Sequence, residues 1–183
     1  SVAMSGTGND AVAIVGAIFA DGSGNDSGAA YLFDISAGGW AQIGNKIVGN
    51  DTDGDDRFGN SVAISGTKAI VGAYLADLCG NDSGAAYLFD VSVGGWAQIG
   101  NTIVGDDTSG GDQFGTSVAI SGTSAIVGAR LANPSGVISG AAYLFDVSDG
   151  GWVQKGDTIV GKDTKDSDQF GWSVAMSGTG NDA

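Results

Sequence analysis

Residues 61–66 read SVAISG, and this hexapeptide decides the fold because it recurs along the whole chain. It returns, once unchanged and twice as SVAMSG, at 117–122, 1–6 and 173–178. Successive starts are therefore 60, 56 and 56 residues apart. Self-similarity at a fixed period is typical of repeat architectures, in which each copy is one supersecondary unit.

The copies are long and closely alike. Residues 61–116 and 117–172 align without a gap, and 40 of their 56 positions are identical. The first copy is four residues longer, because SGTGNDAVAIVGA stands where the second has SGTKAIVGA. We therefore predict three repeats and the start of a fourth, with the boundaries 1–60, 61–116, 117–172 and 173–183.

Each repeat is predicted to form four short β segments. In the second repeat these are 61–65, 69–73, 85–91 and a broken segment over 96–104. The third segment alternates, with Tyr87 and Phe89 on one face and Leu88 on the other. The second, AIVGA, is an uninterrupted apolar run, which is typical of a strand covered on both faces. Four strands per repeat of this length predict an all-β fold of tandem four-stranded propeller-type blades.

The composition excludes several function classes. All 21 acidic residues are Asp, only seven residues are Lys or Arg, and the net charge is −14. Without His there is no Ser–His–Asp triad, imidazole base or His-ligated metal, and the lone Cys79 cannot form an internal disulfide. The acidity argues against nucleic acid as a partner. No apolar run approaches the roughly 20 residues of a membrane span. We expect a protein that is not an enzyme.

The motifs of the second repeat resemble those of a known family. Phe58-Gly59 is followed by SVAI, by Val71-Gly72-Ala73 and then by GAAYLF from Gly84, and the same order recurs in the third repeat. This pattern resembles the FG-GAP repeat, found in the seven-bladed propellers of integrin α chains and in many bacterial and algal surface proteins. The resemblance implies propeller-type blades and an extracellular or cell-surface location.

Two features depart from that family. The proline that usually follows Gly-Ala is replaced by Ile18, Tyr74 and Arg130. The calcium-binding loop that many members carry between the first two strands is reduced to residues 66–68 and 122–124. The repeat is therefore a degenerate form, and that calcium site is not implied for this chain.

Acidic loops before each Phe-Gly offer a different candidate calcium site. Calcium takes six to eight oxygen ligands, and alternating Asp in a glycine-containing turn can present several carboxylates to one point. The candidate ligands are Asp51, Asp53, Asp55, Asp107, Asp112, Asp163 and Asp168. The alternative is that these side chains cap turns by accepting backbone N–H groups.

A second set of loops is a candidate binding surface. Loops 20–28 and 76–84 carry the acids Asp21, Asp26, Asp77 and Asp82. Variable loops on a constant scaffold are where binding function usually lies, although ordinary solvated turns explain the same residues.

Three acceptor sequons for N-glycosylation lie in turns, at Asn25, Asn50 and Asn81. They predict a glycoprotein if the chain is exported.

The ends of the sequence suggest assembly. Residues 1–11 and 173–183 are identical, so a composite unit of 172 residues begins again at Ser173. We expect the chain to be a window of a longer tandem array, a non-catalytic extracellular scaffold whose partners are copies of itself in a surface layer or filament. The second hypothesis is an adhesion propeller that binds a glycan or a surface protein, assisted by calcium.

Overall fold

Strands alone form the regular structure. The computed structural model describes residues 1–6, 11–36, 39–92, 96–134, 136, 138–148 and 150–178. Its strands are β1 (Val2–Ser5), β2 (Val12–Ala17), β3 (Ala29–Asp34), β4 (Ala41–Ile47), β5 (Ser61–Ser65), β6 (Lys68–Ala73), β7 (Ala85–Asp90), β8 (Ala97–Gln98), β9 (Phe114–Ser121), β10 (Ser124–Ala129), β11 (Ala141–Asp146) and β12 (Val153–Gln154). Within these ranges there is no helix, and hence none that could cross a membrane. The all-β prediction is confirmed.

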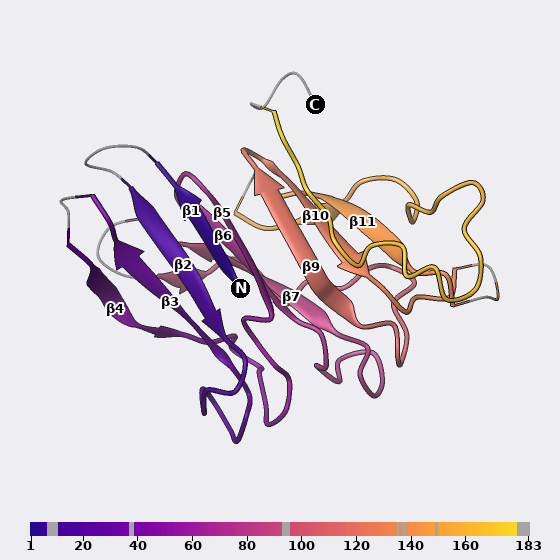
Figure 1. Ribbon diagram of the computed structural model, residues 1–183, viewed down its shortest axis with the longest axis horizontal. Coiled ribbons are helices and arrows are strands. Elements are labelled where there is room, and N and C mark those ends of the chain that lie inside the picture. Colours follow the sequence, from indigo (N-terminus) through magenta and orange to yellow (C-terminus); the bar gives the residue numbers. More distant parts are fainter. Residues whose placement is uncertain are drawn as a thin grey trace.

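The strands pair into three antiparallel four-stranded sheets, each in the order of the sequence (Figure 1). Sheet 1 runs from β1 to β4, sheet 2 from β5 to β8 and sheet 3 from β9 to β12. Each predicted repeat holds one sheet, except that β9 begins at Phe114, three residues before the predicted boundary. Strands that follow one another in the sequence thus lie next to one another in the sheet, as the short turns of each repeat require.

The fourth strand is interrupted in sheets 2 and 3, as predicted for residues 96–104, whereas β4 in sheet 1 is continuous with one shift of register. In sheet 2 the ladder of β8 covers two residues, and pairing with β7 resumes only at the bridge between Ala86 and Ile103. Gly100 lies between these two parts with a φ of +68°. A positive φ bends the strand out of its register at this point.

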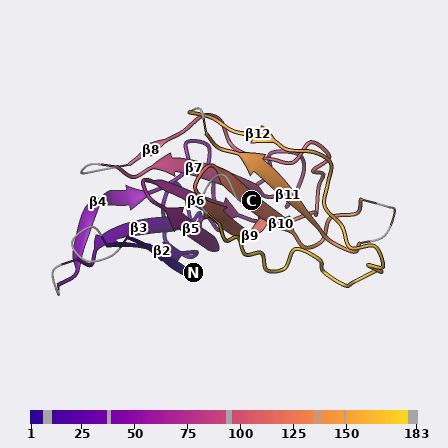
Figure 2. The same cartoon turned by 90° about the horizontal axis from the view of Figure 1, so that it is seen from above.

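The core lies between the sheets. The first strands of neighbouring sheets lie side by side, β1 against β5 and β5 against β9, so that the sheets stack face on face (Figure 2). Between sheets 1 and 2 the buried side chains include Ile14, Leu32 and Ile47 from sheet 1, and Val71, Tyr87 and Phe89 from sheet 2. The same positions, one repeat later, form the core between sheets 2 and 3 as Ile70, Leu88, Ile103, Val127, Tyr143 and Phe145.

The alternation predicted for residues 85–91 explains how the middle sheet serves both cores. Tyr87 and Phe89 pack toward sheet 1, and Leu88 packs toward sheet 3. All three side chains are fully buried. A strand that is covered on both faces is apolar on both, which the run AIVGA in β6 also satisfies.

The Phe-Gly turn joins one sheet to the next. The N–H of Phe58 donates to the carbonyl of Ser27 at 2.8 Å, which anchors its backbone to sheet 1. Its ring points into sheet 2, with its centroid 5.3 Å from that of Tyr87 and 6.0 Å from that of Phe89. Edge-on contacts of this kind add about 1 kcal/mol to the burial of the rings. Phe58 therefore connects the two sheets, through its backbone to sheet 1 and through its ring to sheet 2.

The glycines of these motifs allow the backbones to meet. A Cβ placed on Gly72 would lie 2.1 Å from the carbonyl oxygen of Gly115, the glycine of the next Phe-Gly turn. No side chain fits at that distance, so the strand β6 and the following turn can touch only through a glycine.

We expect Phe114→Ala to destabilise the protein by about 3–5 kcal/mol, because Phe114 is fully buried against Tyr143 and Phe145. Phe170→Ala is the matched control. Phe170 has the same place in the third repeat but is only half-buried, so we expect a much smaller loss. Urea unfolding measures both changes in the free energy of unfolding. Equal losses would contradict the conclusion that the Phe114 ring stabilises the contact between two sheets.

Candidate functional site

The two loop sets that the sequence presents separately meet at one end of the sheets. The N–H of Asp55 donates to the carbonyl of Asn25 at 3.0 Å, which ties loop 51–57 to loop 20–28. One repeat later, the N–H of Gly111 donates to the carbonyl of Asn81 at 2.8 Å. The candidate calcium loops and the candidate binding loops therefore form one continuous edge.

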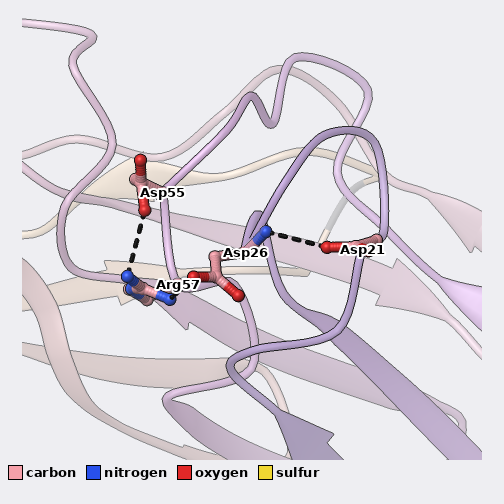
Figure 3. Close-up of polar contacts among 4 residues, drawn as sticks. All are labelled: Asp21, Asp26, Asp55 and Arg57. Carbon is pink, nitrogen blue, oxygen red and sulfur yellow. Dashed lines mark hydrogen bonds and ion pairs between the residues drawn. The ribbon is translucent and has the colours of Figure 1, made fainter.

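An arginine that the sequence analysis did not single out organises this edge in the first repeat (Figure 3). The guanidinium of Arg57 lies 3.2 Å from a carboxylate oxygen of Asp26 and 3.0 Å from one of Asp55. Its Cζ also lies 4.6 Å from the centre of the exposed Phe19 ring. Arg57 thus links both loops and offsets part of their negative charge.

The four acids of the candidate binding loops divide into two equivalent pairs. A carboxylate oxygen of Asp21 accepts the N–H of Asp26 at 3.0 Å, and one of Asp77 accepts the N–H of Asp82 at 2.8 Å. The first acid of each pair therefore stabilises its own loop. The second acid of each pair has a different partner in the two repeats. Asp26 forms an ion pair with Arg57, whereas the position that corresponds to Arg57 in the next repeat is Gln113.

Two candidate calcium ligands, Asp112 and Asp168, cap their own turns, and so does Asp56. Asp56 accepts the N–H of Asp53 at 2.7 Å, a contact that Asp112 and Asp168 repeat at 2.8 Å with Ser109 and 2.7 Å with Lys165. Asp56 was not among the proposed ligands, but it makes the same contact as its two counterparts. Burial, the largest cause, raises the pKa of the Asp56 and Asp112 carboxyls above 3.8. These contacts are those of the turn-capping alternative.

Two further candidates connect neighbouring sheets. Asp51 accepts the hydroxyl of Thr102 at 2.5 Å, and Asp107 accepts that of Thr158 at 2.7 Å. Tyr87 lies beside Asp51, and its buried phenol oxygen has no hydrogen-bond partner among the described residues. Burial, followed by the charge of Asp51, raises the pKa of Tyr87, so this phenol stays neutral.

The structure does not gather the candidate ligands around one point. Asp53, Asp55 and Asp163 are exposed. In the described ranges no three acidic or cysteine side chains come close enough together to hold a metal ion. A cavity of about 280 Å³ is lined by Asp51, Asp53, Asp56 and Asp77. Calcium binding stays a prediction, tested below.

The three sequons share one arrangement. Asn25, Asn50 and Asn81 are exposed, whereas the hydroxyl residue two positions later is buried in each. The hydroxyl of Ser27, for example, accepts the N–H of Ser23 at 2.8 Å. Glycosylation of these asparagines stays a prediction.

A second basic residue outside the predicted sites is Arg130. Its Nε donates to Gln113 at 2.7 Å, and its Cζ lies 4.8 Å from the centre of the Trp172 ring. It replaces the proline expected after Gly-Ala, which was the one signal in the sequence that this position is unusual.

We expect Asp112→Asn to change how stability depends on pH. The folded-state pKa of Asp112 is raised, so its contribution is favourable below 3.8 and is lost as the pH rises through the folded pKa. Asparagine keeps an acceptor for Ser109 and does not ionise. As the pH rises above 3.8, through the folded pKa of Asp112, the variant should therefore gain stability relative to the parent.

Thermal unfolding across this pH range measures the effect. Asp168→Asn is the control, because Asp168 makes the same contact while exposed. A parallel pH dependence for the parent and Asp112→Asn would contradict the role of burial.

The comparison with known proteins agrees with this geometry. No curated protein matches the chain. The FG-GAP repeat family matches residues 40–89 and 96–145, which together are just over half of the chain. Each match begins at the tryptophan before the last strand of one sheet and ends in the third strand of the next, with Phe-Gly between them. The chain therefore belongs to the FG-GAP repeat family.

Proposed function

We propose that this chain is a non-catalytic extracellular scaffold of propeller-type blades, whose units stack head to tail into a surface layer or filament. One observation carries the proposal. The two outer faces of the three-sheet stack repeat the two surfaces that form its internal interfaces. A unit with this property can place its last sheet on the first sheet of another copy.

The outer face of sheet 1 corresponds to the surface of sheet 2 that packs on its neighbour. Tyr31 and Phe33 are only half-buried, whereas their counterparts Tyr87 and Phe89 are fully buried. Trp40 is 79% exposed, and Val2 and Met4 are 66% and 67% exposed. An apolar surface of this kind is typical of an interaction site.

The outer face of sheet 3 corresponds to the other half of the interface. Ile126 and Leu144 are half-buried and Ile159 is 37% exposed, while the equivalent residues Ile70, Leu88 and Ile103 are fully buried. The ring of Phe170 also lies half-buried, without the Tyr–Phe pair that covers Phe58 and Phe114. The two outer faces therefore have complementary residues.

Polar contacts support the same pairing. Trp96 and Trp152 each donate their indole N–H to a carbonyl of the preceding sheet, at 3.3 and 2.9 Å. The corresponding pair between copies is Trp40 with the carbonyl of Asp157. Asp51 contacts Thr102 and Asp107 contacts Thr158 within the chain. The equivalent residues at the contact between copies are Asp163 of one copy and Lys46 of the other. At this position the contact between copies would be an ion pair rather than a hydrogen bond from a neutral hydroxyl.

The contact uses different surfaces on the two partners. Repeating such a contact closes into a ring or continues as a fibre. With a net charge of −14, the copies repel one another at low ionic strength, which limits stacking and keeps the surface solvated.

The scaffold role agrees with the chemistry of the chain. There is no His or Glu in the sequence, and Cys79 occurs in one repeat only. Each of the carboxylates of Asp56, Asp112 and Asp168 accepts a backbone N–H of its own turn, which is a structural contact.

We expect the polypeptide 1–183 to associate reversibly, and more strongly as salt screens its charge. Asp163→Lys should weaken association by about tenfold, because it places two ammonium groups together, and Lys46→Asp in the same chain should restore it. Asp166→Lys is the control for net charge, since Asp166 is also exposed in this loop. Sedimentation equilibrium at several salt concentrations measures these effects, and a monomer under all conditions would refute the scaffold.

A second function has its own support in the acidic edge. The cavity lined by Asp51, Asp53, Asp56 and Asp77 also includes Leu78, which is 44% exposed. A carboxylate-lined cavity beside an exposed apolar side chain is typical of sites that bind a glycan or a protein. The alternative is therefore an adhesion module that calcium assists.

This alternative predicts measurable calcium binding and calcium-dependent retention of a glycan. Calorimetry with millimolar Ca²⁺ tests the first, and a glycan array with and without chelator tests the second. Asp53→Asn should remove both signals, whereas Asp157→Asn, outside the cavity, should not. No heat and no retained glycan would eliminate the adhesion function and leave the scaffold unaffected.

A further inference from the structure

A small cavity lies at the end of the sheets where the innermost strands begin and the second strands end. Its volume is about 310 Å³, and it is lined by Asn60, Tyr74, Thr116, Arg130 and Trp172. Three of these residues directly follow a Phe-Gly turn, whereas Tyr74 and Arg130 directly follow the Val-Gly-Ala that ends β6 and β10. We call this space the Arg130 cavity.

The positions that line the cavity vary from repeat to repeat. The position after Phe-Gly and the position after Val-Gly-Ala hold a different residue in each of three copies, namely Asn60, Thr116 and Trp172 for the first and Ile18, Tyr74 and Arg130 for the second. The second and third repeats are nevertheless identical at 40 of 56 positions. The same backbone thus accommodates all of these side chains, so packing within a sheet does not require them. Variable positions on a constant scaffold are where binding function usually lies.

Arg130 brings to this cavity a positive charge that no described carboxylate neutralises. Its Nε donates to Gln113 at 2.7 Å, and its Cζ lies 4.8 Å from the centre of the Trp172 ring. Among the described residues its two terminal nitrogens make no hydrogen bond and no ion pair, although the chain contains 21 Asp. The guanidinium is therefore held in place at Nε and at one face, and four of its five N–H donors remain available.

The other arginine of the chain shows what a guanidinium does here when carboxylates are within reach. Arg57 also lies over an aromatic ring, with its Cζ 4.6 Å from the centre of Phe19, but it pairs with Asp26 and Asp55 at 3.2 and 3.0 Å. Both arginines are half-buried. Arg57 completes a network within the chain, whereas Arg130 has a similar aromatic contact without the acids. This difference indicates that the anion for Arg130 comes from a ligand.

The other lining residues restrict the chemistry of that ligand. A guanidinium matches a planar carboxylate with two parallel hydrogen bonds, but an ion pair at a partly exposed site contributes little by itself. Tyr74 and Trp172 add aromatic surface to the cavity. The Asn60 side chain donates to the carbonyl of Thr116 at 2.9 Å, and its own oxygen accepts no hydrogen bond from a described residue. The cavity therefore suits a ligand with a carboxylate, an apolar face and hydroxyl donors.

We propose that the Arg130 cavity binds a terminal uronic-acid residue of a glycan. A hexuronate offers its carboxylate to Arg130, the C–H groups of one ring face to the aromatic side chains, and a hydroxyl to Asn60. A single negative charge also fits the net charge of −14, which repels polyanionic ligands. The proposal uses neither a contact between copies nor the cavity at Asp53, so it is independent of both functions proposed above.

NMR of the nitrogen-labelled arginine side chains tests the site directly. Arg57 and Arg130 are the two arginines of the sequence, so the Nε–H spectrum holds two signals, and Arg130→Lys assigns them. We expect methyl glucuronide at millimolar concentrations to shift the Arg130 signal and to leave the Arg57 signal in place. Methyl glucoside, which has the same ring without the carboxylate, should need about tenfold more for the same shift.

Substitutions taken from equivalent positions separate binding from folding. Tyr74→Ile and Trp172→Thr introduce the residues found at positions 18 and 116. Each should weaken the binding of methyl glucuronide by about tenfold, because it removes aromatic surface from the cavity. Phe19→Leu is the matched control, since it introduces the residue of positions 75 and 131 beside Arg57, and it should leave binding unchanged. Urea unfolding verifies that each variant is folded.

The outcomes decide for or against the proposal. Selective shifts at Arg130 that weaken in Tyr74→Ile and Trp172→Thr support it. It is overturned if glucuronide shifts neither arginine signal or shifts both equally. It is also overturned if acetate, a carboxylate without a ring, acts at the same concentration. An equal or stronger effect of N-acetyl-aspartate amide would replace the sugar by an acidic peptide. If one variant fails to fold, the series of ligands on the parent chain still decides.

Failure of this site is distinguishable from failure of the functions proposed above. Association of the chain is measured by sedimentation without any sugar, and calcium binding is measured by calorimetry at another cavity. Either result can stand while the Arg130 signal stays in place.

Discussion

The contact on which the stack depends is the close approach of backbone to backbone at each Phe-Gly turn. The glycine of the turn meets the glycine of the second strand, and the phenylalanine beside it enters the next sheet. The first contact requires the absence of a side chain, and the second requires a large one. Because these two requirements fall on adjacent positions, the Phe-Gly dipeptide recurs while the loops around it vary.

No single sheet has a hydrophobic core of its own, because each core lies between two neighbouring sheets. Sheet 2 buries both faces only because it lies between two neighbours, and its Tyr87 and Leu88 belong to different cores. The stability of such a molecule is approximately the sum of the stability of each repeat and of the interfaces between neighbouring repeats. The outer faces of sheets 1 and 3 carry residues equivalent to those of the internal interfaces.

The carboxylates of the acidic loops have different kinds of partner in the tertiary structure. Asp51 and Asp107 hold neighbouring sheets together, whereas Asp56, Asp112 and Asp168 cap turns. Spacing along the chain made all of these except Asp56 candidate metal ligands, because spacing cannot distinguish carboxylates that converge from carboxylates that each accept from a nearby donor. Arg57 was overlooked for the same reason, since its role arises from Asp26, more than thirty residues away in the first repeat.

The sequence by itself determined the all-β class, the repeat period and the strands with alternating side chains. These follow from local patterns, such as SVAISG and the alternation around Tyr87, that hold whatever the sheets pack against. Only the tertiary structure decided which face of each sheet meets which neighbour, what the Asp carboxylates bind and where segment 173–178 lies. The contacts between sheets, such as that of Asp51 with Thr102, depend on distances between residues some fifty or more positions apart, and the order of the sequence does not contain such distances.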